Sequence, residues 1–385
     1  MSVFNRNHVD VMQTPMFLGD DLSIARYDVV KHPVFDELIE KTHSFFWRPD
    51  EINLSTDRIQ YQNMSEVEKF FFTENLRYQI LMDSIQGRAP AVVLAPMVSD
   101  PALDTWTQTW TFSETIHSRS YTHILRNCFV DPAAEFDKVI DNPDIMKRAE
   151  SIGQYYDNLS DVYRAYLNAV DSIEFAKNFG DDVETAIEDA DDMKKEVMRA
   201  LYLCLHAVNA LEAIRFYVSF ACTFSFAERG LMEGNAKIMK FIARDEALHL
   251  KGTQYIIKQI HSGGEGEEFK KIAEELKETA EKIFMEVVHQ EKDWVDHLFS
   301  RGSIPLLAPD VLKQYVEYLA DSRMRAVGLD SPFETRRHPL PWIRKWLNSE
   351  SVQVAAQEAE ITYLVSQVDN DLNDESYKRF DKFKK

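Results

Sequence analysis

The chain has 385 residues, 45% of them apolar, which is enough to bury a large core, and its formal net charge is −20. This acidic balance argues against binding to nucleic acids or anionic membranes, because both need basic surfaces. Only 12 glycines and 13 prolines occur, which favours long helices over turn-rich β structure. The first ten residues lack an apolar signal region and the three cysteines are scattered, so we expect a reduced, cytoplasmic protein.

Helical spacing of apolar residues recurs along most of the chain after an irregular start. Several helix ends carry clear signals, such as the capping box Ser65-Glu66-Val67-Glu68, the glycine stop at Gly87 and the N-cap pair Asp100-Pro101. No linker interrupts the helical pattern before residue 348, so residues 1–347 are predicted to form one helical domain. The predicted helices span residues 33–46, 65–87, 101–129, 143–170, 193–228, 234–261, 267–299 and 309–327.

Two segments do not fit this pattern. Residues 171–192 are acidic and weakly patterned, so we expect a solvated surface insertion with no assigned role. Residues 348–385 are polar and acidic around a short apolar segment at 361–365, which predicts a mobile tail able to bind a partner. The alternative for this tail is a frayed terminus.

The sequence Glu-x-x-His occurs twice, at Glu114–His117 and at Glu246–His249. On an α-helix these positions lie about 60° apart around the axis and about 4.5 Å apart along it, so both side chains can reach one metal ion. One such pair alone is common on helix surfaces. Two pairs on facing helices can hold two ions when two other helices of a four-helix bundle each add a carboxylate.

Asp83 and Glu212 are the candidates for those two additional carboxylates. Each lies in an apolar helical stretch, where an unpaired carboxylate would cost several kcal/mol unless it bound a cation. Four carboxylates balance two divalent ions, and oxygen-rich ligands suit iron or manganese better than zinc. The sequence does not choose between iron and manganese, and buried salt bridges are the alternative to a metal site.

Tyr121 follows His117 by one helical turn, so the two lie on the same helix face. A metal pair that activates O2 could remove an electron and a proton from such a phenol. Phe216 and Phe220 follow Glu212 at steps of four and would form an apolar wall that excludes water. Taken singly, these residues also fit an ordinary core.

Several long motifs resemble the small, radical-generating subunit of class I ribonucleotide reductase, especially the class Ia type of bacteria and phages. Three motifs carry most of the resemblance: Ser-Glu-Thr-Ile-His-Ser-Arg-Ser-Tyr-Thr-His (113–123), Asn-Ala-Leu-Glu-Ala-Ile-Arg-Phe (209–216) and Ile-Ala-Arg-Asp-Glu-Ala-Leu-His (242–249). Shorter matches at 16–19 and 44–49 extend it over nearly the whole chain. The resemblance implies an all-α fold, a ferritin-like four-helix bundle with additional helices and a diiron-carboxylate site inside it.

The resemblance also implies a role for individual residues. Tyr121 would carry a stable radical, Trp47 and Asp245 would relay an electron through His117, and Tyr363, assisted by Glu358, would pass the radical to a partner chain. The hydrophobic pocket of the radical would consist of Phe216, Phe220 and Ile242. The six metal ligands would be Asp83, Glu114, His117, Glu212, Glu246 and His249.

The cofactors implied are two oxo-bridged iron ions, with manganese left open, and the tyrosyl radical. The implied assembly is a homodimer whose C-terminal tail binds a large subunit, which would reduce ribonucleoside diphosphates to deoxyribonucleotides. The chain itself contains no glycine-rich phosphate loop. Two other functions remain open: a diiron oxygenase or desaturase, and a ferritin-like iron store.

Overall fold

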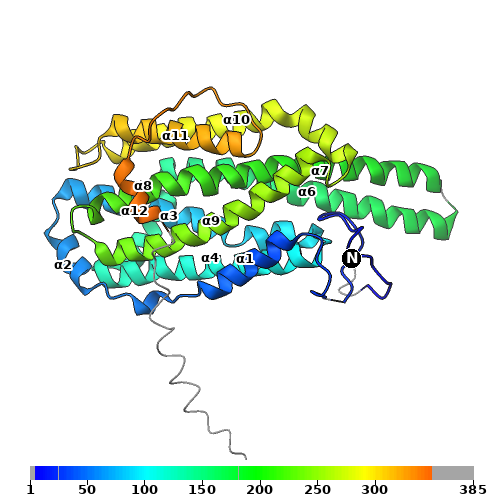
Figure 1. The fold of residues 1–385 in the computed structure, drawn as a ribbon, viewed down its shortest axis with the longest axis horizontal. Coiled ribbons are helices and arrows are strands. Elements are labelled where there is room, and N and C mark those ends of the chain that lie inside the picture. The colour runs from blue at the N-terminus through cyan, green and yellow to red at the C-terminus, as the bar shows by residue number, and fades with distance from the viewer. Residues whose placement is uncertain (1–4, 25, 181, 349–385) are drawn as a thin grey trace, which may run out of the picture.

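The computed structural model describes residues 5–24, 26–180 and 182–348, and these residues form the predicted all-α fold (Figure 1). Their only β pairing consists of two isolated bridges. Short 3-10 or π segments lie at 49–51, 90–94, 95–97, 211–215 and 341–343. The α-helices are α1 (Pro33–Ser44), α2 (Ser55–Asn63), α3 (Glu66–Gln86), α4 (Pro101–Cys128), α5 (Pro132–Asp141), α6 (Pro143–Phe179), α7 (Val183–Ala210), α8 (Phe216–Ala227), α9 (Glu233–Ser262), α10 (Glu267–Leu298), α11 (Pro309–Ala326) and α12 (Arg344–Leu347).

Four helices form the centre of the bundle, because α3 packs on α4, α4 on α9, α9 on α8 and α8 back on α3. Helix α8 is the innermost of these, and every one of its residues is buried. Helices α1 and α2 cover α4, whereas α10 and α11 cover the α7–α8 side (Figure 1). These four central helices are therefore shielded from water by a second layer of helices.

One stretch of the described chain, Val183–Ala227, is long and apolar enough to cross a membrane by length and composition. However, 83% of its most apolar window is buried inside the protein. Its apolar character is therefore explained by its place at the centre of the bundle.

Most predicted helix ends are confirmed to within a few residues. The capping box is present: Ser65 Oγ accepts from Glu68 N at 3.3 Å, and Glu68 Oε2 accepts from Ser65 N at 3.2 Å. The Asp100 side chain likewise accepts from Leu103 N at 2.8 Å and caps α4. Such local signals fix a helix end because they satisfy backbone N–H groups that have no partner within the helix.

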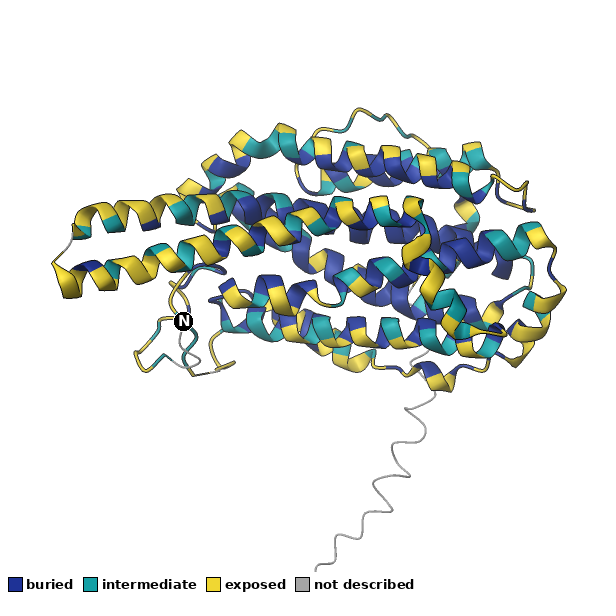
Figure 2. Ribbon diagram, turned by 180° about the vertical axis from the view of Figure 1, so that it is seen from behind, coloured by how far each residue is buried: buried dark blue, intermediate teal, exposed yellow. Residues whose placement is uncertain are grey.

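The limits predicted around residues 171–192 are wrong. This segment lies at the surface, but α6 and α7 extend through it as a helical hairpin that projects from the bundle (Figure 2). Gly180 ends α6 with φ of 79°, and the Asp182 side chain caps α7 by accepting from Glu184 N and Thr185 N. The hairpin buries little apolar surface, which explains why its helical pattern is weak in the sequence.

Three short helices, α2, α5 and α12, were not predicted, and neither was an irregular turn before α8. Helix α2 has nine mostly polar residues and so carries little periodic signal, whereas α5 is amphipathic but has only ten residues. The predicted helix 193–228 is interrupted by a π-helical turn, Leu211–Arg215, in which Phe216 N bonds to Leu211 O. This turn contains Glu212, and π turns often occur at functional sites.

Gly252 lets α9 approach α4 closely, because a Cβ at this position would lie 2.2 Å from Cζ2 of Trp106. We expect Gly252→Ala to lower the free energy of unfolding by about 1–3 kcal/mol through overpacking. Gly153→Ala is the matched control: it lies inside α6 with no atom within 4 Å of its Cβ position, so it should gain about 0.5–1 kcal/mol. Thermal unfolding followed by circular dichroism measures both. Equal stability of the two variants would contradict the close packing.

Candidate metal centre

The six predicted ligands lie on α3, α4, α9 and the π turn that precedes α8, and they converge at one place in the bundle. Each of these residues is at most 1% exposed. Their ligand atoms form two overlapping groups, and within each group all of these atoms lie within 4.8 Å of one another. Glu114 and Glu246 belong to both groups, as two bridging carboxylates would. The first group is Asp83, Glu114, His117 and Glu246; the second is Glu114, Glu212, Glu246 and His249.

The two histidines face the carboxylates through Nδ1. His117 Nδ1 lies 3.2 Å from Glu114 Oε2 and 3.2 Å from Glu246 Oε1. His249 Nδ1 lies 2.9 Å from Glu246 Oε2 and 3.3 Å from Glu114 Oε1. Each Glu-x-x-His pair therefore turns both side chains toward the same point, as the i, i+3 spacing predicts.

The two outer carboxylates, Asp83 and Glu212, make no hydrogen bond with any residue that the structure describes. Among the described residues, no donor bonds to either oxygen of Asp83 or of Glu212, although all four oxygens are buried. Burial, together with the charges of Glu114 and Glu246 respectively, raises the pKa of Asp83 and of Glu212 well above the usual range. Because an ionised carboxylate is costly in such a place, these oxygens fit cations better than they fit the protein alone.

The histidine pKa values reflect the same negative cluster. Burial alone would lower them, but the neighbouring carboxylates outweigh it. Hydrogen bonds to Asp245 and Glu114 raise the pKa of His117 well above its usual value. Glu114 and Glu246 raise the pKa of His249 to about 9. In the absence of metal the cluster therefore attracts protons, and bound cations would compete with those protons.

Tyr121 lies one turn beyond His117 on α4 and is 1% exposed. Its hydroxyl has no hydrogen-bond partner among the described residues. Burial and the Asp83 charge raise the pKa of Tyr121 well above its usual value, so the phenol keeps its proton. Phe216, Phe220 and Ile242 are also buried, and the two phenylalanine rings stack at 6.0 Å.

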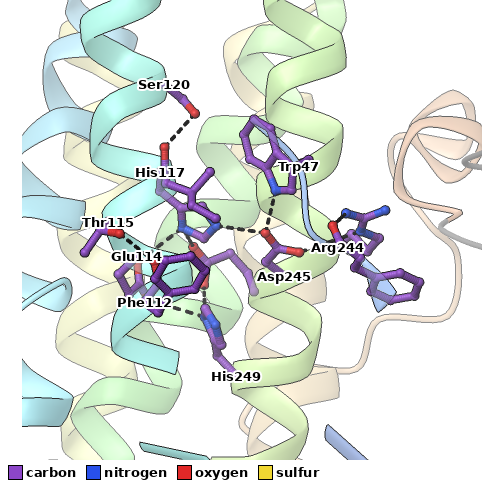
Figure 3. A network of polar contacts seen from close by, with 12 residues as sticks. Trp47, Phe112, Glu114, Thr115, His117, Ser120, Arg244, Asp245 and His249 are labelled. Atoms are coloured by element: carbon purple, nitrogen blue, oxygen red, sulfur yellow. Dashed lines mark hydrogen bonds and ion pairs between the residues drawn. The ribbon is translucent and has the colours of Figure 1, made fainter. Parts of the chain in front are cut away.

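Asp245 connects the cluster to Trp47. Its Oδ2 atom lies 3.2 Å from His117 Nε2 and accepts a hydrogen bond from Trp47 Nε1 at 2.9 Å (Figure 3). Trp47 is 1% exposed, yet it lines a surface pocket of about 490 Å³. A continuous row of contacts therefore runs from His117 to the surface.

Trp110 belongs to the site, although the sequence analysis did not select it. Its Nε1 donates to Glu114 Oε1 at 2.8 Å, and its ring stacks on His249 at 5.2 Å. The sequence contained one signal for Trp110: it precedes Glu114 by four residues, so the two side chains lie on the same helix face. Tyr363 and Glu358, which were also predicted, lie outside the described residues.

Comparisons with known proteins agree with this geometry. The family model "Ribonucleotide reductase, small chain" matches residues 26–339. The chain is 54% identical over 387 residues to the ribonucleoside-diphosphate reductase subunit beta of Enterobacteria phage T4, covering 99% of both chains. It is 51% identical over 380 residues to the subunit beta of ribonucleoside-diphosphate reductase 1 from Escherichia coli O157:H7, covering 98% of this chain and 99% of the relative.

The chain belongs to the ribonucleotide reductase small chain family. The fold agrees with this: a ribonucleotide reductase subunit from Clostridium botulinum has a TM-score of 0.70 at 22% identity and covers 90% of this chain and 98% of its own. The dimanganese(II)-NrdF of Streptococcus sanguinis has a TM-score of 0.64 at 19% identity, covering 85% and 99%. In this small chain, the buried cluster of four carboxylates and two histidines fits a dinuclear metal site.

Glu212 and Glu291 provide a direct test, because both are fully buried but only Glu291 is paired, with Arg215. We expect Glu212→Leu to raise the unfolding midpoint of the metal-free small chain at pH 8, since it removes a carboxylate that costs about 1–3 kcal/mol. The same variant should lose most of the stabilisation that added Mn(II) gives the wild type.

Glu291→Leu is the control and should instead destabilise the metal-free protein by about 3–5 kcal/mol, because it leaves a buried cation unpaired. Scanning calorimetry with and without Mn(II) measures both effects. A metal-free midpoint that falls equally in both variants would show that Glu212 is an ordinary paired core residue.

Proposed function

We propose that this chain is the radical-generating subunit of an aerobic ribonucleotide reductase and that Tyr121 carries its stable radical. The observation that supports this most strongly is the pair of overlapping ligand groups, which share Glu114 and Glu246, with Tyr121 one turn beyond His117. The proposed ligands are the six residues of the two groups. Membership of the family adds independent support for the reductase reaction.

When bound, a pair of iron or manganese ions would supply the redox chemistry by which O2 becomes an oxidant strong enough for a phenol. Tyr121 would lose one electron to that oxidant and one proton from its hydroxyl. The proton would move toward Asp83, whose charge acts strongly on Tyr121 and whose oxygens accept no hydrogen bond from any described residue. Phe216, Phe220 and Ile242 would keep water and reductants away from the oxidised ring.

The contacts at Asp245 support a route for the electron. His117 and Trp47 share one carboxylate oxygen, so electron transfer through the indole can be coupled to the hydrogen bonds on that oxygen. The pocket beside Trp47 brings the route to the surface, and its rim carries Arg48, Arg119 and Arg126. We propose that Tyr363, assisted by Glu358, takes over from Trp47.

The proposed partner is the large subunit of the reductase, bound through the tail, residues 348–385, while residues 1–347 form the radical-generating domain. The partner would reduce ribonucleoside diphosphates to deoxyribonucleoside diphosphates with the radical equivalent that this chain supplies. We propose a homodimer as the assembly of the small chain.

Tyr121→Phe tests the radical assignment. Metal-free protein loaded with Fe(II) and exposed to O2 should give a tyrosyl electron paramagnetic resonance signal in the wild type and none in Tyr121→Phe. Both proteins should bind the same amount of iron, because the phenol is not among the ligands. A tyrosyl signal that persists in Tyr121→Phe would place the radical elsewhere. Equal iron uptake with no signal in either protein would favour an oxygenase.

Removal of residues 350–385 tests the role of the tail. The truncated chain should retain its metal content and its tyrosyl signal, because all six ligands and Tyr121 lie before residue 350. Its affinity for the large subunit, measured by calorimetric titration against the full-length chain, should fall at least tenfold, equivalent to about 1.4 kcal/mol. Unchanged affinity would show that binding occurs through the helical domain.

A further inference from the structure

A second polar network lies beside the metal cluster and is centred on Arg215, three residues after Glu212 in the π turn. The Arg215 side chain is 2% exposed and makes its contacts away from the cluster. Its Nη1 donates to Glu291 Oε1 at 3.1 Å, and its Nη2 donates to Ser151 Oγ at 2.8 Å and to Gln290 Oε1 at 2.7 Å. Nη1 also donates to Tyr78 Oη at 3.4 Å, and a guanidinium held by four acceptors has one well-defined position.

The charge of Arg215 is neutralised by Glu291, which is fully buried on α10. Tyr78 on α3 donates to the same oxygen, Glu291 Oε1, at 2.6 Å. Arg148 on α6 lies nearby, with Nε 3.8 Å from Glu291 Oε1. The network therefore fastens the π turn to α3, α6 and α10. Removal of a partner from such a buried pair is strongly unfavourable, so the turn is fixed firmly.

Glu212 depends on this fixed turn more than Glu114 and Glu246 depend on their backbones. Glu114 is held by Trp110, and Glu246 lies against both histidines. In contrast, no donor among the described residues bonds to the Glu212 carboxylate. The direction of that side chain is therefore set by the backbone from which it projects.

The π turn makes the side chains of Glu212 and Arg215 project in different directions. In a regular α-helix, positions three apart lie only about 60° apart around the axis, so Glu212 and Arg215 would project to similar sides. A π turn carries more residues per turn and spreads them further apart. This spread lets Glu212 face the cluster while Arg215 faces α6 and α10.

We propose that Arg215 is a positioning residue for one half of the metal centre: it holds the π turn so that Glu212 faces the second ligand group. This inference rests on the metal centre proposed above. It predicts an asymmetric defect, because Glu212 belongs only to the second group, with Glu114, Glu246 and His249. The group that contains Asp83 and His117 does not include it and should remain intact.

The test is a Mn(II) titration of the metal-free, full-length protein, in which free Mn(II) is followed by its six-line electron paramagnetic resonance signal. The wild type should bind two ions per chain. Arg215→Met should bind one ion with wild-type affinity and the other about 10–100-fold more weakly, the usual range for loss of a residue that orients a ligand. Two ions bound with unchanged affinity would overturn the proposal.

Arg148→Met is the matched control. Arg148 is as deeply buried as Arg215 and shares Glu291, but it lies on α6 and bonds to the carbonyls of Asp144 and Gln290. It should keep both ions even if it lowers the unfolding midpoint. The same loss of one ion in both variants would mean that general destabilisation, and not the position of the turn, weakens the site.

Two further results distinguish a failure of the positioning role of Arg215 from a failure of the proposed metal centre. If Arg215→Met does not fold, Arg215→Lys decides: its single ammonium keeps the charge beside Glu291 but cannot reproduce the bonds to Ser151 and Gln290, so the second ion should still bind more weakly. Wild-type binding of both ions by Arg215→Lys would overturn the positioning role. Failure of the wild type itself to bind two ions would instead refute the metal centre.

Discussion

Four carboxylates placed together inside an apolar helix bundle are the constraint on which the rest of the structure depends. Their mutual repulsion and loss of water oppose folding, so the protein must hold them with many other contacts. The surrounding layers supply those contacts: α8 is buried along its whole length, and α10 and α11 cover the side that α1 and α2 leave open. Stability must come from these surrounding contacts, because Asp83 and Glu212 have no hydrogen-bond partner among the described residues.

The buried carboxylates of the described chain differ in whether a cationic side chain neutralises them. Glu291 is neutralised by Arg215, which makes it a stabilising part of the structure. Asp83 and Glu212 are left without any such partner in the described chain, although each is as deeply buried as Glu291. The difference separates a carboxylate that is paired within the protein from two carboxylates that fit a cation, and the two kinds lie on neighbouring elements. A burial pattern alone would not distinguish them.

Much of this was accessible from the sequence because the signals are local. The Glu-x-x-His spacing, the capping box at Ser65 and the isolation of Asp83 and Glu212 among apolar residues each depend on a few neighbouring positions. What could not be predicted depends on distant partners. Trp110 can be recognised as part of the site only when the structure shows that it stacks on His249. Arg215 can be recognised as important only when the structure shows that it pairs with Glu291 of α10. The helical hairpin across 171–192 was not predicted, because a helix that packs on only one neighbour has few apolar residues at helical spacing.

The π turn at Leu211–Arg215 also alters the alignment of everything that follows it. An extra residue in one turn shifts the phase of the helix, so α8 presents a different face than an unbroken continuation of α7 would present. Removing one residue here would restore a plain α-helix of nearly the same length, with the same loops at both ends. Formally, then, the turn is equivalent to a single-residue insertion in a structural helix. A change of one residue in the length of a helix can therefore redirect a side chain such as Glu212 without changing the order of the helices.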